Sequence, residues 1–338
     1  MNNKLYINLS NKKLKKLPDL TEYTNLKILK CSNNQLTELR NLPNTIIELY
    51  CDGNQLTELN NLPNSLTTLC CSNNQLTTLN NLPDSLTRLY SNYNQLTELN
   101  NLPNSLTTLC CNHNQLTTLN NLPDSLIRLY SINNQLTTLN NLPNTLNVLH
   151  CGCNQLTELN NLPNTLTILY CSYNQLTELN NLPNTLIYLD CDYNQLIELN
   201  NLSESLTFLS CSYNQLTELS NFPNKLNQLY CNNNQLITLK NLPDKLYTLE
   251  CQHNLLTKLH NLPKSLKSSI ELTWFTCYGN QLLFVEVQEF IKLDNFIKFF
   301  NLNKLLKVIF LYSVKKRCLK YKEELIIKTC HPSRLSFI

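Results

Sequence analysis

The chain has very little glycine and no long apolar run, and each shortage argues against a class of protein. Three glycines among 338 residues are too few for a glycine-rich phosphate loop, and no nucleophile motif is present. The most apolar run, residues 308–312, is far shorter than the ~20 residues that a membrane-spanning helix needs. Residues 1–10 lack the apolar core of a secretory signal, so we expect a cytoplasmic protein without a membrane segment.

Charge is small overall and uneven along the chain. The formal net charge of +3 is too small to indicate a nucleic-acid partner by itself. Residues 285–338 hold eleven lysines and arginines against five acidic residues, so this segment carries +6 and the remainder −3. A solvated helical face explains such a segment better than a membrane or nucleic-acid patch does. We therefore expect neither a membrane nor a nucleic acid as the partner.

Asparagine supplies 57 of the 338 residues, and its spacing indicates a repeat. From Cys31 onward the sequence repeats every 20 residues for twelve copies, and the copy that begins at Leu66 reads LTTLCCSNNQLTTLNNLPDS. One equivalent asparagine marks each copy: Asn34, Asn54, Asn74, Asn94, Asn114, Asn134, Asn154, Asn174, Asn194, Asn214, Asn234 and Asn254.

Apolar and polar residues alternate at the start of each copy, as in a half-buried strand. Strands of successive copies are then expected to stack in parallel at about 4.8 Å. A single copy cannot cover its own apolar side, so the copies must stack as a one-dimensional array. The positions predicted to point inward are those of Leu66, Leu69, Cys71, Leu76, Leu79 and Leu82.

Two further positions predict how the chain turns. Asn74 and its equivalents follow the strand, where a buried amide can satisfy backbone groups that have lost their sheet partners, so we expect a stacked asparagine ladder. Pro83 and its counterparts exclude a regular helix on the return leg, which should be extended with short turns.

The pattern L-x-x-L-x-L-x-x-N-x-L, with Cys71 in the third apolar place, resembles the leucine-rich repeat over residues 4–284. The 20-residue unit and its Leu-Pro-x-x-Leu element resemble the short-repeat subclass of bacterial effectors. The asparagine-rich composition and residues 331–335 are similar to leucine-rich repeat proteins of amoeba-infecting giant viruses. The resemblance implies a repeat solenoid, a horseshoe with a parallel β-sheet on its concave face and an extended convex side.

The array differs at its two ends. Lys12 replaces the ladder asparagine, so residues 1–25 are interpreted as an N-terminal cap. Residues 26–284 form the array of about 13 repeats. Beyond Val285 the apolar spacing changes, and residues 285–338 are expected to form a basic, helical C-terminal cap over the last core layer.

Most of the sixteen cysteines occupy one inward position, where Ser91 and Ser131 also occur, which favours a small buried core site with reduced thiols. Cys70, Cys110 and Cys153 are instead expected on the open surface. The eleven inward cysteines are Cys31, Cys51, Cys71, Cys111, Cys151, Cys171, Cys191, Cys211, Cys231, Cys251 and Cys277.

Neither metal binding nor catalysis is predicted. His150 and Cys153 share the open surface with Cys110 and His113, but these residues lie two copies away, about 10 Å, which is too far for a zinc site. Asp190 and Asp192 are a carboxylate pair at a spacing of roughly 7 Å, yet an open polar strand is the preferred interpretation. We expect no cofactor.

Tyrosines recur at outward positions of the predicted sheet. Such residues provide large contact areas at interfaces, although codon usage and the strand propensity of tyrosine account for the same enrichment. The candidate partner-binding residues are Tyr50, Tyr90, Tyr130, Tyr170 and Tyr230 in a central column, Tyr93, Tyr173, Tyr193 and Tyr213 in a neighbouring column, and Trp274 beside them.

An internal duplication supports an adaptable surface. Residues 61–100 and 101–140 differ at six positions, and five of these lie in or beside the outward strand face. The leading hypothesis is a non-enzymatic scaffold that binds a protein on its concave face, with a host protein as partner if the viral likeness holds. A self-associating structural component is the alternative, an enzyme is disfavoured, and the oligomeric state stays open.

Overall fold

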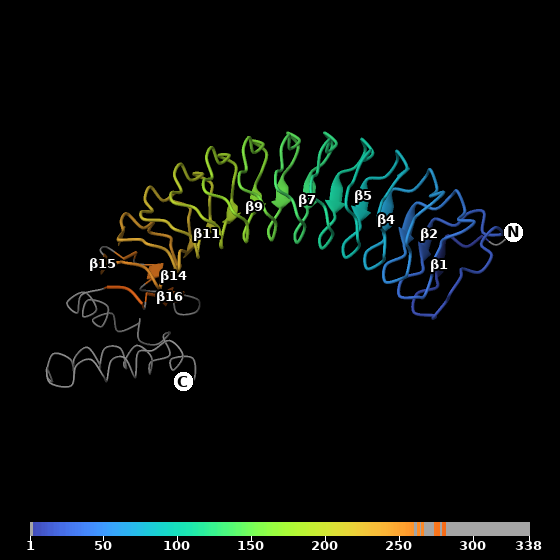
Figure 1. The fold of residues 1–338 in the computed structure, drawn as a ribbon, viewed down its shortest axis with the longest axis horizontal. Coiled ribbons are helices and arrows are strands. Elements are labelled where there is room, and N and C mark those ends of the chain that lie inside the picture. The colour runs from blue at the N-terminus through green and yellow to red at the C-terminus, as the bar shows by residue number, and fades with distance from the viewer. Residues whose placement is uncertain (1–2, 260–261, 264, 267–273, 278, 282–338) are drawn as a thin grey trace, which may run out of the picture. The chain divides into compact units, whose positions relative to one another are not determined.

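The computed structural model describes residues 3–259, 262–263, 265–266, 274–277 and 279–281 (Figure 1). The chain divides into two compact units, residues 1–195 and residues 196–338, which are called unit 1 and unit 2 here. Within the described residues, no helix is long and apolar enough to cross a membrane. The proposed helical cap, residues 285–338, lies outside the described part of the chain.

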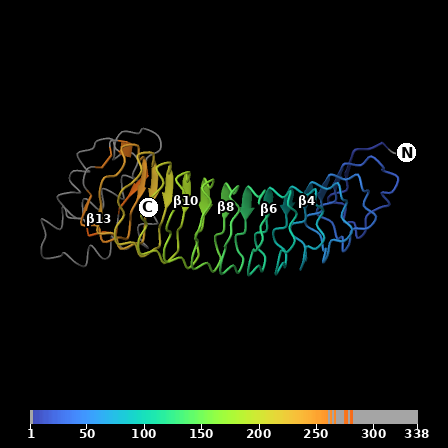
Figure 2. The ribbon, with the colours of Figure 1, turned by 90° about the horizontal axis from the view of Figure 1, so that it is seen from above.

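Unit 1 is a coil in which every copy contributes one three-residue strand to a parallel sheet (Figure 2). Each strand pairs with the equivalent residues of the next copy, so that Leu69 is opposite Leu49 on one side and Leu89 on the other. The predicted parallel stacking is therefore confirmed. The strands are β1 (Tyr6–Asn8), β2 (Ile28–Lys30), β3 (Glu48–Tyr50), β4 (Thr68–Cys70), β5 (Arg88–Tyr90), β6 (Thr108–Cys110), β7 (Arg128–Tyr130), β8 (Val148–His150), β9 (Ile168–Tyr170) and β10 (Tyr188–Asp190).

Unit 2 continues the same pattern of one strand per copy. Its main strands pair in the order β11 (Phe208–Ser210), β12 (Gln228–Tyr230), β14 (Thr248–Glu250) and β16 (Trp274–Thr276). Two short strands on the return leg, β13 (Thr238–Leu239) and β15 (Lys258–Leu259), form a separate parallel pair.

The predicted inward positions form the core. Leu66, Leu69 and Cys71 have no exposed surface, and the return-side leucines such as Leu79 are also buried. Ten of the eleven inward cysteines are fully buried, and Cys277 is partly exposed. Because each copy contributes apolar groups that its two neighbours cover, the core is a continuous stack of layers, as the sequence predicts.

The exchange of cysteine for serine in this core has a structural reason. The Cys51 thiol donates to the carbonyl of Cys70 at 3.3 Å. The Ser91 hydroxyl donates to the equivalent carbonyl of Cys110, also at 3.3 Å. Thiol and hydroxyl therefore fill the same small site and satisfy the same backbone acceptor on the next strand. Burial raises the pKa of the Cys31 thiol to about 12, which keeps it protonated.

The asparagine ladder is confirmed, and it holds each turn to the one before it. The Asn114 amide nitrogen donates to the carbonyls of Ser91, Cys111 and Asn112 at 3.0, 3.1 and 3.2 Å. Its side-chain oxygen accepts the backbone N–H of Leu96 at 3.0 Å. One amide thus satisfies buried backbone groups in two successive copies.

The return leg consists of turns, as its prolines predict. In the copy of β4 the backbone N–H of Leu66 closes a turn by donating to the carbonyl of Pro63 at 3.0 Å. The hydroxyl of Ser65 then donates to Asn44 and Ile46 of the preceding copy, both at 2.7 Å. Hydrogen bonds between copies therefore hold the return side where no sheet is present.

The first copy lacks a ladder asparagine of its own and uses that of the second. Asn34 accepts the backbone N–H groups of Lys12 and Leu14, both at 3.0 Å. Its amide donates to the carbonyl of Leu9 at 2.9 Å. This arrangement explains how Lys12 is tolerated at a ladder position within the expected cap.

Asn114→Ala should lower the free energy of unfolding by about 3 kcal/mol, because it leaves the Leu96 N–H and the Ser91 carbonyl buried without partners. Chemical denaturation followed by circular dichroism measures the loss. The control is Gln115→Ala, whose exposed side chain lies next to the ladder and whose removal should cost less than about 0.5 kcal/mol. Equal losses from the two variants would contradict the ladder's structural role.

Candidate partner-binding surface

The central column of the sheet is half-buried, which the sequence did not predict. In unit 1 it alternates large and small side chains, with Cys70 between Tyr50 and Tyr90 and Cys110 between Tyr90 and Tyr130. The four tyrosines of the column in unit 1 are neither fully buried nor fully exposed.

Cys110 is buried, with 8 % of its surface exposed, so its expected position on the open surface is wrong. It points away from the core, but two tyrosines of adjacent strands flank it. Thr68 and Ser72, also on the outward side, are buried too. Cys70 and Cys153 keep partly exposed thiols, as predicted.

Aromatic contacts continue along the central column at β7 to β9. The His150 ring lies 4.7 Å from the Tyr130 ring and 4.0 Å from the Tyr170 ring, measured between ring centroids. Burial lowers the pKa of His150 from 6.5 to about 4, so the imidazole is neutral at physiological pH. The centre of the sheet is therefore an uncharged aromatic stripe.

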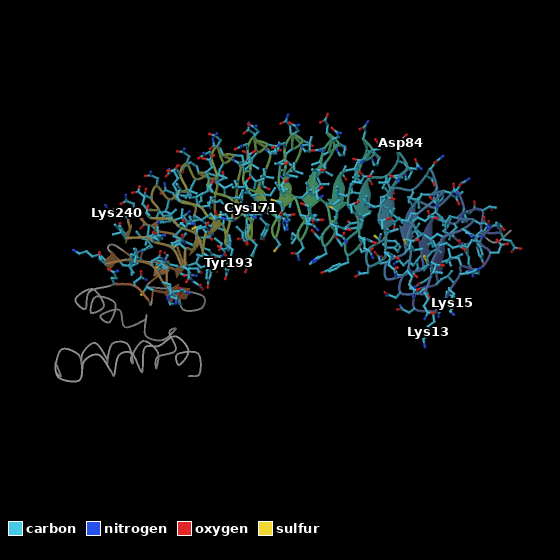
Figure 3. The ribbon with its side chains drawn as sticks, in the orientation of Figure 1. Lys13, Lys15, Asp84, Cys171, Tyr193 and Lys240 are labelled. Carbon is cyan, nitrogen blue, oxygen red and sulfur yellow. The ribbon has the colours of Figure 1, made fainter. Side chains whose placement is uncertain are left out.

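The neighbouring column of tyrosines lies on the turn after each strand and is more exposed. We name it the turn column, and in unit 1 its members from the second copy onward are Asn33, Gly53, Asn73, Tyr93, His113, Asn133, Cys153, Tyr173 and Tyr193. Tyr93 and Tyr173 are 53 % and 52 % exposed. Figure 3 shows Tyr193 at the edge of unit 1 opposite to that of Asp84, which lies on a return-leg turn.

Every described residue of the turn column has a positive φ, between +51° for Tyr193 and +71° for Gly279. This left-handed conformation suits glycine and asparagine, and it costs a bulky residue on the order of 1 kcal/mol. A second left-handed position in each copy, from Asn41 to Asn241, is asparagine in all eleven described copies. Against that constant position, the tyrosines of the turn column occupy a backbone site to which they are poorly suited.

Rings of the turn column stack on one another across adjacent copies. The Tyr93 and His113 rings lie 4.1 Å apart at an interplanar angle of 9°, and the Tyr173 and Tyr193 rings lie 4.2 Å apart at 10°. Such stacking offsets part of the conformational cost. It also fixes the rings in place before any partner arrives, which reduces the entropy lost on binding.

The candidates in unit 2 form a set of their own. Tyr213 is 44 % exposed at the turn column, and Tyr230 is half-buried on β12 with its ring 5.4 Å from that of Phe208. Trp274 lies on β16, opposite Thr248 of β14, and its side chain is outside the described part of the structure.

The acidic pair beside β10 is tied into the turn. Burial raises the pKa of Asp190, while the backbone N–H of Asp192 donates to its carboxylate at 3.2 Å. In the described part of the chain, no group of three or more histidine, cysteine or acidic side chains is placed to hold a metal ion.

The sequence analysis missed two arginines on the sheet, Arg88 and Arg128, which are exposed on β5 and β7. It also missed the left-handed turn column. The signal for the latter was present, since a position that accepts asparagine, glycine and histidine is typical of a positive φ.

Tyr93→Asn should change the free energy of unfolding by less than about 0.5 kcal/mol, because relief of the left-handed strain offsets the lost stacking on His113. Tyr90→Asn, in the same copy but half-buried in the central column, should cost at least about 1 kcal/mol. Denaturation midpoints of the two variants decide the point. A larger loss at Tyr93 than at Tyr90 would show that the turn column is primarily structural.

His150 should make stability depend on pH. The folded chain holds a neutral imidazole, so the unfolded chain binds more protons between pH 6.5 and about 4, and stability should fall as pH drops through this window. His150→Gln should remove that part of the fall, measured by denaturation at about pH 7 and about pH 4.5. An imidazole that titrates near 6.5 by NMR would contradict the burial argument.

No family model matches the chain, and no curated protein matches it in sequence. Solved structures do match. YopM from Yersinia enterocolitica WA-314 is 33% identical with a TM-score of 0.68 over 80% of this chain, which spans 63% of the length of that protein. CroV588, a giant-virus protein described as a circular leucine-rich repeat structure, is 32% identical with a TM-score of 0.50, covering 76% of this chain and 47% of its own.

YopM from Yersinia pestis, described as a leucine-rich effector protein, has a TM-score of 0.69 over 82% of this chain. The predicted likeness to bacterial effectors and to giant-virus proteins is thus confirmed. Proteins of this kind are generally non-enzymatic and take part in protein–protein interactions. With 32% identity across 88% of the Yersinia pestis YopM chain, this chain belongs to the leucine-rich repeat proteins.

Proposed function

We propose that the chain is a binding scaffold without catalytic activity, whose partner is a protein of a host cell. The observation that carries the proposal is the turn column, where tyrosines are exposed, stacked and held in a left-handed conformation. Strain that a fold does not need is concentrated at functional sites in proteins. The tyrosines of this column are therefore explained by contacts with something outside the chain.

The face has the dimensions of a stable interface. Ten strands at about 4.8 Å give unit 1 a face roughly 45 Å long, which is enough for a contact of standard size. Rigid aromatic side chains are the residues that most often dominate binding energy. The stacked rings of the turn column supply such anchors, and the half-buried central column supplies a flat floor beside them.

The relatives support the direction of the proposal. One is described as an effector and another is a giant-virus protein, and both descriptions are consistent with a partner in another organism's cell. We propose that the chain works in the host cytoplasm, where reducing conditions suit its column of buried thiols.

Replacing Tyr93 and Tyr173 together by asparagine should weaken capture of the partner at least tenfold, because each anchor contributes on the order of 2 kcal/mol. Capture from amoebal lysate by the immobilised chain, quantified by mass spectrometry, measures the change. The matched control replaces Asn120 and Asn140, exposed on the return side, by alanine and should leave capture unchanged.

Two outcomes would count against the scaffold. Equal losses in the two double variants would move binding away from the sheet side. A chain that captures only further copies of itself, and elutes as an oligomer, would favour the self-associating structural component.

A further inference from the structure

Charge on the sheet side of unit 1 is segregated along the coil. The five positions in and beside each strand that we compare are, in the copy of β5, those of Thr87, Arg88, Tyr90, Asn92 and Tyr93. In the copies of β5 to β9 none of these positions is acidic, and Arg88 and Arg128 are the charged residues among them.

Acidic residues bound this segment on both sides. Glu48 and Asp52 lie at these positions in the copy of β3, and Asp190 and Asp192 lie at them in the copy of β10. The middle of the face therefore favours a negatively charged ligand, and its two ends disfavour one.

The two arginines are free to bind an anion. Arg88 donates through Nε to the Thr68 hydroxyl at 3.1 Å, which orients the side chain and leaves its terminal nitrogens available. Within the described residues the ion pair of unit 1 is Arg40 with Glu38, and neither Arg88 nor Arg128 lies at ion-pair distance from a carboxylate. Exposed guanidinium groups are well suited to take a carboxylate by two parallel hydrogen bonds.

The spacing of these arginines selects the conformation of the ligand. β6 separates β5 from β7, so equivalent residues are about 9.6 Å apart at a strand spacing of about 4.8 Å. In a polyproline II helix, residues three apart point the same way and are separated by about 9.3 Å. In an extended strand, side chains on one face repeat at about 6.6 Å and about 13 Å, neither of which matches.

The aromatic floor has the same two-strand period. Tyr90 and Tyr130 stand on either side of the smaller Cys110, so the surface rises and falls once for every two strands. Aromatic-lined surfaces are the usual recognition sites of polyproline II segments, because prolines pack against the rings. One turn of such a ligand would thus meet one tyrosine and one arginine.

We propose that the face over β5 to β9 binds an acidic protein segment in the polyproline II conformation, with two carboxylates three residues apart taken by Arg88 and Arg128. The inference rests on the proposed scaffold function and specifies the chemistry of the partner. Carboxylates, rather than phosphates, are the ligands to which the spacing is fitted here.

Two synthetic peptides of equal composition and charge test the proposal on the full chain. One carries Glu-Pro-Pro-Glu between proline-rich flanks, and the other carries Glu-Glu-Pro-Pro between the same flanks. Each is labelled with fluorescein and titrated by anisotropy at about 0.15 M salt, where exposed charges more than about 8 Å apart are largely screened. The first peptide should bind at least tenfold more tightly than the second.

Arg88→Gln and Arg128→Gln should each weaken the first peptide at least fivefold, and Arg→Lys at either position should weaken it by less. The matched control is Lys15→Gln, which removes one exposed positive charge elsewhere in unit 1 and should leave the affinity unchanged. Denaturation midpoints of all variants confirm that the fold is retained. Equal binding of the two peptides, an equal effect of Lys15→Gln, or no binding of either peptide would overturn the proposal.

The same variants separate this inference from the scaffold function. If capture of a host protein is lost in the Tyr93 and Tyr173 double variant but survives loss of both arginines, the scaffold function stands and the acidic ligand is wrong. If the arginine variants lose peptide binding as expected while no host protein is captured, the site stands and the proposed host partner is wrong.

Discussion

The buried amide of the ladder asparagine is the interaction on which the rest of the structure depends. A chain that reverses direction twice in 20 residues leaves backbone groups inside the coil without sheet partners. Asn134 resolves this by donating to the carbonyls of Cys111, Ser131 and Ile132 and accepting the N–H of Leu116. Because every bond reaches a fixed position in the same or the preceding copy, the length of the copy cannot vary. Variation is confined to the side chains that point outward.

The parts of the structure that the sequence predicts are those set within one copy. The inward positions of Leu69 and Cys71, and the ladder role of Asn74, follow from alternation and from the 20-residue period alone. The burial of Cys110 could not be predicted in this way, because it depends on tyrosines 20 residues away on each side. Burial on a sheet face is decided by neighbours across the strands, and a pattern along the chain does not report their size.

The conformation of Tyr93 escaped prediction for a different reason. Its positive φ comes from the turn that Asn94 holds, not from any preference of tyrosine. The same turn imposes a positive φ at Asn101, where asparagine recurs in every described copy. Two positions under the same backbone constraint thus differ in what they accept, and the constraint alone cannot account for the tyrosines. A stack whose stability is summed over many copies can tolerate a cost of on the order of 1 kcal/mol at a few of them.

The duplication of residues 61–100 connects the sequence to the shape of the ligand. Copying a 40-residue segment reproduces Arg88 as Arg128 and Tyr90 as Tyr130, and so gives the face a period of two strands without any new selection for spacing. The changes since that event include Asn92 to Ile132 and Tyr93 to Asn133, both beside the strand, while the arginines and central tyrosines are the same in both halves. Drift that alters the flanks and keeps a cation and an aromatic ring in register at about 9.6 Å retains the features that a repeating ligand would contact. Random loss on an unused face would have no reason to retain that pair.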